Sequence, residues 1–443
     1  MEDKQLFELV EKHRIKFIDL QFTDLAGVVK AVTIPIEKLP TALDQNVWFD
    51  GSSIEGFTRI TESDMYLKLD SKTFAILPWT ANSDYPTARI ICDVYLPDGT
   101  LYPGSPRTVL RKELEKLEKM GFTLNLGPEL EFFLLQRTNG KISALPHDGA
   151  GYFDQSTDLG TAIRQEITEA LQAMNIEVEA LHHEVAAGQH EIDFRYNDAL
   201  TVADHAMTFK FVVKSIAHRH GLHATFMPKP IAGINGSGMH VHQSLFRNGK
   251  NEFFSATSTH HLSDLALHWI GGLIKHARSM TGILNPTVNS YKRLVKGYEA
   301  PVYICWATRN RSALIRVPRF TQGREASSRV ELRSPDPSAN PYLAFAIMAA
   351  AGLDGILNKI TPPEPAEEKN IFEISDENLI QQNVPVLPAS LREAIGELER
   401  DSVLVDALGE ELFQKFKRAK MQEWMAYSTA VSQWELDTYL EVI

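Results

Sequence analysis

The sequence predicts an α+β fold, in which a small and mostly β amino-terminal domain precedes a larger domain that mixes helices and strands. Residues 14–97 alternate short apolar runs with Gly and Asp turns, as half-buried strands do. From about residue 104 onward, strand-like runs alternate with long segments that have the apolar spacing of helices. The 443 residues, of which 44% are hydrophobic, are enough for two cores. We place the domains at residues 14–97 and 104–443.

The elements follow in chain order from these patterns. In the first domain, the alternation is clearest over residues 15–20 and 88–94. A turn-rich stretch follows, and Ser105-Pro106 then starts a helix that should end at Gly121. The Pro-rich segment 361–369 is predicted to be an exposed loop. Further helices are expected over residues 159–174, 202–220, 263–280, 341–358, 390–407 and 410–425.

Composition and charge argue against several classes of protein. The apolar run at 342–357 is interrupted by Gly352 and Asp354, so no run reaches the roughly 18 to 20 residues of a membrane helix. The first residues lack the apolar centre of a signal peptide, and we therefore expect a cytoplasmic protein. Cys92 and Cys305 are too few for a disulfide framework or a zinc site. A net charge of −12 argues against a general nucleic-acid binder.

Two pairs of glutamates stand out in the larger domain. In the predicted strand 123–135, alternation places Glu129 and Glu131 together on the face opposite the leucines. Like charges this close repel unless water, a proton or a cation compensates them, and a solvated strand face is the plain alternative. Glu184 and Glu191 flank a predicted hairpin turn at Gly188 and could face each other across it. A polar hairpin at a rim is the alternative there.

Two further strands carry polar side chains on one face. His240, His242 and Ser244 alternate after a Gly-rich turn, but no Lys-Ser or Lys-Thr follows the glycines, so the segment is not a P-loop. Glu331 and Arg333 share a face of the strand around them, where a surface ion pair is the alternative. Five glutamates and one histidine, without thiolates, suit two hard divalent cations such as Mg²⁺ or Mn²⁺ and favour phosphoryl transfer.

A cluster of arginines and a long loop complete the candidate site. Seven arginines against two glutamates give residues 309–333 a local charge of +5, which suits carboxylate and phosphate recognition. Few aromatic residues lie among them, so a nucleic-acid site is the weaker interpretation. The loop 285–301 carries Arg293 and Glu299 and reads as a lid, with an ordinary surface loop as the alternative. The arginines are Arg309, Arg311, Arg316, Arg319, Arg324, Arg329 and Arg333.

Together these segments resemble class I glutamine synthetase of bacteria, over essentially the whole chain from about Arg14 to Ile443. The motifs that carry the resemblance occur in the family's order and approximate spacing. They are Phe49-Asp-Gly-Ser-Ser-Ile54, Gly127-Pro-Glu-Leu-Glu131, His183-Glu-Val-Ala-Ala-Gly-Gln189, Gly236-Ser-Gly-Met-His240, Asn285-Pro through Tyr291-Lys-Arg293, and Asn310-Arg-Ser312.

The resemblance implies a β-grasp domain at 14–97 and a catalytic domain at 104–443 whose antiparallel sheet forms an active-site funnel. It implies a dodecamer of two stacked hexameric rings, with active sites between neighbouring subunits. The implied reaction is ATP-dependent ligation of ammonia to the γ-carboxylate of L-glutamate through γ-glutamyl phosphate. The implied cofactor is Mg²⁺ or Mn²⁺, with two or more ions in each site.

Residue roles can be carried over from the family position by position. One cation would be held by Glu131, Glu184 and Glu191, and the second by Glu129, His240 and Glu331. Glutamate would be bound by Asn235, Gly236, Arg293, Glu299, Arg311 and Arg333. ATP would contact Glu179, Tyr196, His242, Ser244, Arg311, Arg316 and Arg329. The ammonium pocket would comprise Asp50 and Ser53 of the adjacent subunit with Tyr152 and Glu184, and the catalytic groups would be Asp50, Glu299 and Arg311.

Two details of the resemblance bear on regulation. One branch of the family carries a tyrosine that is adenylylated, whereas the corresponding region here has Phe372, so we expect no adenylylation. The segment around Arg59 resembles the Gram-positive branch, in which glutamine inhibits the enzyme directly and the inhibited form binds nitrogen-regulatory transcription factors. We therefore expect feedback inhibition through Arg59.

Two other functions stay open at this point. A ligase of the same fold could couple glutamate to a larger amine such as a polyamine, but Asp50, Ser53, Tyr152 and Glu299 together favour ammonia. A catalytically inactive nitrogen sensor would bind regulators without turning over ATP. The presence of every expected acidic ligand argues against a sensor.

Overall fold

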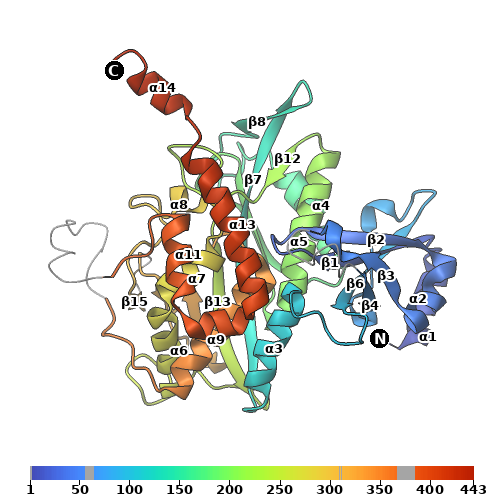
Figure 1. Cartoon of the computed structure of the whole chain (residues 1–443), viewed down its shortest axis with the longest axis horizontal. Coiled ribbons are helices and arrows are strands. Elements are labelled where there is room, and N and C mark those ends of the chain that lie inside the picture. The colour runs from blue at the N-terminus through green and yellow to red at the C-terminus, as the bar shows by residue number, and fades with distance from the viewer. Residues whose placement is uncertain (1, 55–63, 309, 311, 367–384) are drawn as a thin grey trace.

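The computed structural model describes residues 2–54, 64–308, 310, 312–366 and 385–443 (Figure 1). Two sheets organise these residues, and each has its own hydrophobic core. The predicted α+β class is confirmed, with a smaller β-rich part built from the beginning of the chain and a larger mixed part built from the rest.

The first part is a six-stranded sheet with strand order β2-β1-β6-β4-β3, in which β5 pairs with β6. Its central pair, β1 and β6, is parallel, whereas the other pairs are antiparallel. Apolar residues of α1 (Asp3–Lys12) and α2 (Leu39–Gln45) belong to its core. The strands are β1 (Phe17–Thr23), β2 (Val29–Pro35), β3 (Val47–Asp50), β4 (Asp64–Leu69), β5 (Ala75–Ile76) and β6 (Thr87–Tyr95).

The second part is built on an 11-stranded sheet with the central order β15-β16-β17-β13-β7-β10-β9. The long strand β7 (Thr123–Thr138) lies in its middle and also pairs with β8, β11 and β12. Every pair except β15 with β16 is antiparallel, as expected. The other strands are β8 (Lys141–Pro146), β9 (Val178–His183), β10 (Gln189–Phe194), β11 (Asn197–Asp198), β12 (His223–Thr225), β13 (Met239–Arg247), β14 (Lys250–Asn251), β15 (Trp306–Ala307), β16 (Ile315–Arg316) and β17 (Val330–Leu332).

Helices cover the second sheet, and the apolar segment predicted as a core helix is one of them. Helix α9 (Pro341–Leu357) is buried almost along its whole length. It packs closely on α6, since a Cβ on Gly272 would lie 2.1 Å from the carbonyl oxygen of Ala351. None of the helices in the described ranges combines the length and hydropathy needed to cross a lipid bilayer. The remaining helices before α9 are α3 (Pro106–Glu118), α4 (Thr161–Ala173), α5 (Ala199–Arg219), α6 (Asp264–Lys275), α7 (Ala277–Leu284) and α8 (Ser290–Arg293).

Two predicted single helices are wrong, because each is a pair. The segment 263–280 is divided at His276 into α6 and α7, and the segment 390–407 is divided at Asp401 into α11 (Leu391–Glu399) and α12 (Ser402–Leu408). The imidazole of His276 contacts the carboxylates of Asp401 and Asp354, at 2.6 and 3.0 Å. The carboxylate of Asp401 also caps α12. One polar cluster, formed by His276, Asp354 and Asp401, therefore stabilises both interruptions of the helices.

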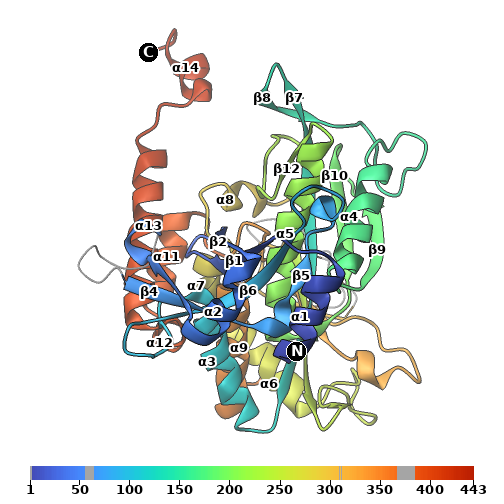
Figure 2. The same ribbon diagram turned by 90° about the vertical axis from the view of Figure 1, so that its right-hand side faces the viewer.

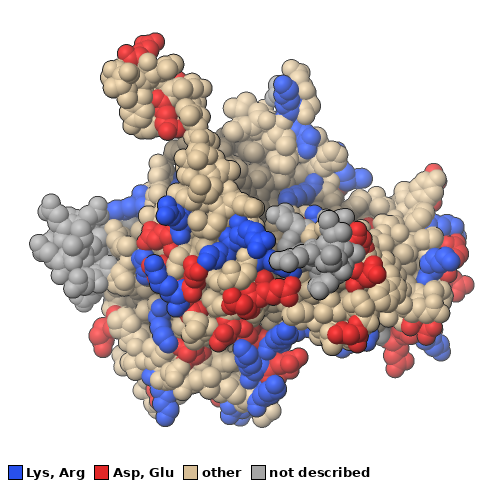
Figure 3. Space-filling view, in the orientation of Figure 1, with Lys and Arg blue, Asp and Glu red and all other residues tan. Residues whose placement is uncertain are grey.

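The end of the chain forms an arm that the sequence analysis did not predict. Helix α13 (Glu410–Ser428) leads to a short helix, α14 (Gln433–Tyr439), which stands away from the body in Figures 1 and 2. Trp434 is 64% exposed and Leu440 is 73% exposed. In Figure 3 this arm is largely uncharged apart from acidic residues, whereas Lys, Arg, Asp and Glu intermix over the body below it. Trp434 contacts only the ring of Tyr439 among the described aromatic residues, so the arm presents exposed apolar side chains.

A buried arginine joins the two parts. Arg107, in α3, donates to both carboxylate oxygens of Asp204 in α5, at 3.0 and 2.8 Å. The same guanidinium donates to Asp93 of β6 at 2.6 Å and to Asp70, just beyond β4, at 2.9 Å. A planar guanidinium has several N–H groups and can therefore donate to three carboxylates at once. We infer that Arg107 fixes the first sheet against the helices of the second part.

Replacing Arg107 with Lys is expected to lower stability by about 1–3 kcal/mol, because an ammonium has three N–H groups at one point and cannot make the four hydrogen bonds of the guanidinium. The melting temperature, followed by circular dichroism, measures the loss. Arg111→Lys is the matched control: Arg111 contacts Asp70 and Asp93 from the same helix but its side chain is 31% exposed, so its loss should be smaller. Equal melting temperatures for the two variants would contradict this role of Arg107.

Candidate active site

The two predicted glutamate pairs meet on neighbouring strands. In the antiparallel pairing of β10 with β7, Glu191 lies opposite Glu131 and Asp193 lies opposite Glu129. Residues that alternate along each strand point to the same face, so four carboxylates stand together there. Asp193 was not predicted. Its spacing of two residues from Glu191 was the signal that could have found it.

The histidines and Glu331 approach this group from β13 and β17. His240 lies opposite Glu129 in the sheet, and its Nδ1 is 3.2 Å from Glu129 Oε2. His242 Nε2 is 2.8 Å from Glu129 Oε1. Glu331 accepts from Arg333 at 2.8 Å and from Arg316 at 2.5 Å. Oxygen or nitrogen atoms of Glu129, His242 and Glu331 lie within 4.8 Å of one another.

A second set of possible ligands lies around the end of β9. Atoms of His182, Glu184 and Glu191 lie within 4.8 Å of one another. The nearby carboxylate of Glu131 accepts from the side-chain amide of Gln189 at 2.7 Å and from the N–H of Gly238 at 2.9 Å. The predicted hairpin is present and brings Glu184 close to Glu191, although the residue directly opposite Glu191 is His182. His182 and Gln189 were not among the predicted site residues.

These side chains line a cavity of about 400 Å³. A second cavity, of about 440 Å³, adjoins it, and Glu129 lines both. The first contains all six predicted metal ligands together with Tyr152, Asn235, Gly236, Arg293, Glu299, Arg316 and Arg333. The second contains Glu179, Tyr196, His242, Ser244 and Arg329. Of the described residues predicted to contact ATP, Arg316 alone lies with the metal ligands instead of in the second cavity.

The glutamates of the first cavity are strongly perturbed. Burial, reinforced by Glu184, raises the pKa of Glu131 to about 8. Burial also raises the pKa of Glu184 to about 7, and burial with Glu131 raises the pKa of Glu191 well above its ordinary value. For Glu129, burial opposes ionisation, but the hydrogen bonds from His240 and His242 hold its pKa below the usual range. Buried carboxylates that lie close to one another form a donor set whose repulsion divalent cations compensate.

The described residues that were predicted to bind glutamate line the same cavity. Gly236 packs so closely that a Cβ there would lie 2.2 Å from the carbonyl oxygen of Pro228, so only glycine fits. Arg293 is buried and donates to the carbonyl oxygen of Ser334 at 2.8 Å. Glu299 is exposed and accepts from the side chain of Asn235 at 3.2 Å.

Some predicted site residues lie elsewhere or outside the described residues. Asp50 ends β3 in the first sheet and lines neither cavity of this chain. This position agrees with its assignment to a neighbouring subunit's site, which stays a prediction. Arg59, Arg311 and Phe372 lie outside the described residues, as does the side chain of Ser53. The predictions about feedback inhibition and adenylylation that rest on Arg59 and Phe372 therefore stay predictions.

Comparison with known proteins gives the family. The chain matches the family model of the glutamine synthetase β-grasp domain over residues 14–97 and that of the glutamine synthetase catalytic domain over residues 103–439. The chain belongs to the glutamine synthetase family. The resemblance seen in the sequence motifs is thereby confirmed, including its likeness to the Gram-positive type.

Relatives of this glutamine synthetase match over nearly their whole length. The chain is 52% identical to the glutamine synthetase of Thermus thermophilus over 441 residues, which is 98% of each chain. It is 48% identical to that of Staphylococcus aureus over 437 residues, 98% of this chain and 97% of the relative. A solved structure of a GmaS/ADP complex shares 34% identity and has a TM-score of 0.87, with 98% of this chain and 99% of the other covered.

Proposed function

We propose that this enzyme is a glutamate–ammonia ligase that makes glutamine in two steps. An oxygen of the glutamate γ-carboxylate attacks the γ-phosphorus of ATP, ADP leaves, and a γ-glutamyl phosphate forms. Ammonia then attacks the activated carbonyl carbon, and phosphate leaves. The observation that supports this best is the pair of adjoining cavities, one rich in carboxylates and arginines and one of nucleotide size, which meet at Glu129.

The carboxylate groups fit two divalent cations, because they are buried, close together and hard oxygen donors. Glu131, Glu184 and Glu191 would hold one ion, and Glu129, His240 and Glu331 the other. Bound Mg²⁺ or Mn²⁺ would supply charge neutralisation for the transferred phosphoryl group. His242 lies as close to Glu129 and Glu331 as a ligand would, so it can share the second ion or bind the nucleotide.

The arginines and the second cavity would bind the substrates. Arg293, Arg311 and Arg333, with the turn at Asn235-Gly236, would hold the glutamate carboxylates, and Arg forks match such groups in a bidentate way. Glu179, Tyr196, Ser244 and Arg329 would bind ATP in the second cavity. Arg316, which contacts Glu331 in the first cavity, would neutralise the γ-phosphate of ATP.

Ammonia would be generated where two subunits meet. Tyr152 and Glu184 line the cavity from this chain, and Asp50 and Ser53 of a neighbouring subunit would complete the pocket. Hydrogen bonds from Ser52 lower the pKa of Asp50, so its carboxylate is ionised and carries the negative charge that attracts ammonium. The apolar side chains on the arm at α14 support an oligomer, and we propose the dodecamer of two hexameric rings.

Glu299 is the proposed lid carboxylate. It has a φ of 59°, which is strained for a residue with a side chain, and strain of this kind often accompanies a segment that changes conformation. Replacing Glu299 with Ala is expected to leave ATP binding largely intact but to increase hydrolysis of the acyl phosphate by water. The measurement is the ratio of glutamine formed to phosphate released, which should fall below one. An unchanged rate and ratio of glutamine formation would refute the lid role.

The central experiment measures phosphate release from ATP with glutamate in Mg²⁺, with and without ammonium. The proposal expects glutamine and phosphate in equal amounts when ammonium is present. Putrescine in place of ammonium tests the amine, and faster product formation with putrescine would instead favour the polyamine ligase. Absence of ATP turnover under all conditions would point to the inactive sensor.

A further inference from the structure

Glu184 differs from the other proposed cation ligands in how its backbone is held. Glu129, Glu131, Glu191, His240 and Glu331 lie within strands of the second sheet, where ladder hydrogen bonds fix them. Glu184 follows the last residue of β9 and begins the turn to β10. Its N–H donates to the carbonyl oxygen of Gln189 at 2.8 Å, whereas its carbonyl oxygen is contacted by the side chain of His183.

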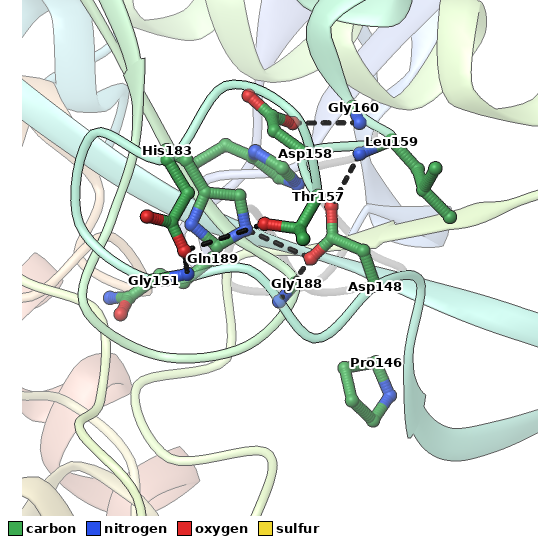
Figure 4. Close-up of polar contacts among 12 residues, drawn as sticks. Pro146, Asp148, Gly151, Thr157, Asp158, Leu159, Gly160, His183, Gly188 and Gln189 are labelled. Carbon is green, nitrogen blue, oxygen red and sulfur yellow. Dashed lines mark hydrogen bonds and ion pairs between the residues drawn. The ribbon is translucent and has the colours of Figure 1, made fainter.

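The buried carboxylate of Asp148 contacts the same turn from another segment. Asp148 Oδ1 accepts from the backbone N–H of Gly188 at 3.0 Å, at the far end of the turn, and from His183 Nε2 at 2.9 Å. Its Oδ2 accepts from the N–H of Leu159 at 3.0 Å. Figure 4 shows Asp148 between these groups, which come from three different segments. The side chains of Asp148 and His183 are both fully buried.

His183 connects Asp148 to the backbone of Glu184. Its Nδ1 lies 2.7 Å from the backbone carbonyl oxygen of Glu184, which can only accept, so this nitrogen donates. The chain of contacts thus runs from the carboxylate of Asp148 through one imidazole to the backbone of the proposed ligand. The carbonyl of His183 also accepts from the N–H of Phe153 at 3.3 Å, which ties in the segment carrying Tyr152.

The residues packed around this turn allow it few other conformations. Gly188 has a φ of 69°, and a Cβ there would lie 2.8 Å from Pro146 and 3.0 Å from the carbonyl oxygen of Leu134. Behind His183, the ring of His190 packs at 4.8 Å between ring centres and is held through Nδ1 by Arg164 at 2.7 Å. The polar contacts of Asp148 therefore join closely packed segments.

We propose that Asp148 is a positioning residue that, through His183 and Gly188, sets the place of Glu184 and of the loop bearing Tyr152. This inference rests on the proposed function, in which Glu184 serves both a cation and the ammonium pocket. Partners of this kind, one step removed from a metal ligand, typically influence metal affinity or activity by about 10- to 100-fold.

The test replaces Asp148 with Asn in the full-length enzyme. An amide of the same shape offers one acceptor oxygen where three N–H groups need acceptors, so at least one contact is lost. We expect one of the two Mn²⁺ ions to bind about tenfold more weakly, measured by the free Mn²⁺ signal in electron paramagnetic resonance. The KM for ammonium should rise by a similar factor, while the KM for ATP stays within about twofold.

Asp354→Asn is the matched control, because Asp354 also pairs with a buried histidine, His276, but lines neither cavity. It should lower the melting temperature without changing Mn²⁺ binding or the KM for ammonium. If Asp148→Asn fails to fold, His183→Gln replaces it, since Gln can still donate toward Asp148 but not toward the Glu184 carbonyl. Equal Mn²⁺ binding and ammonium KM in the site variant and the control would overturn the inference. Absence of glutamine formation by the unmodified enzyme would instead overturn the proposed function.

Discussion

Replacing Glu131 with Gln is expected to lower glutamine formation by roughly 10²–10³-fold, the size of effect seen when one electrostatic group is removed from an active site. The carboxylate of Glu131 is buried and held in place by hydrogen bonds from Gln189 and Gly238, so it is positioned as a cation ligand. The amide is nearly the same size but carries no charge. Steady-state rates at saturating Mg²⁺ measure the loss.

The same variant should be at least as stable as the unmodified protein when metal is absent. Burial disfavours the charged form of Glu131, and this charge repels that of Glu184, as the raised pKa of Glu131 shows. Removal of the charge relieves both effects. The rise in melting temperature on addition of Mn²⁺ should shrink at the same time. Glu113→Gln is the control, because Glu113 is also buried, on α3, but pairs with Lys116 outside the site. Full activity of Glu131→Gln would contradict a ligand role for Glu131.

The affinity of the metal-free enzyme for Mn²⁺ is expected to rise steeply between pH 6 and pH 8. In that range Glu184 and Glu131, whose pKa values are raised to about 7 and about 8, lose the protons with which a cation competes. Each proton displaced contributes roughly tenfold in affinity per pH unit. Calorimetric titration with Mn²⁺ in buffers of different ionisation enthalpy measures both the affinity and the protons released. An affinity that is flat over this range would contradict the prediction.

The stability of the metal-free protein should change with pH in the opposite direction. A carboxyl group whose pKa is raised by folding holds a proton that the unfolded chain releases, so the folded state loses stability as pH rises from about 4.5 to about 8. Below that range both states are protonated, and above it the cost is constant. Melting temperatures are measured with and without Mn²⁺ at pH 5.5 and at pH 8. The difference that Mn²⁺ makes to the melting temperature should be larger at pH 8.

Local patterns predicted most of the elements and one face of each active-site strand. The alternation in β7 puts Glu129 and Glu131 opposite Leu130 and Phe132 whatever the rest of the chain does, because the period of a strand is set by its own backbone. The same reasoning would have found Asp193, which alternates with Glu191.

The wrong helix predictions concern features that depend on contacts with residues far away in the sequence. The apolar spacing of 263–280 is continuous, yet α6 ends and α7 begins at His276 because Asp354 and Asp401 bind that imidazole. The contact of Arg316 with Glu331 on the adjacent strand was likewise not predicted, and the assignment of Arg316 to ATP stays a prediction. The helix breaks and this pairing both depend on tertiary contacts that apolar spacing does not encode.

The sequence by itself determined the chemistry of the site: which side chains are acidic, which of them share a strand face, and the family motifs in which they occur. Only the tertiary structure decided that these faces meet, because the sheet order β17-β13-β7-β10-β9 differs from the order of the strands in the chain. Pairing between distant strands is set by packing and register across the whole sheet, which no local pattern contains. The same holds for Asp148, which reaches Gly188 across 40 residues to support the turn beside Glu184.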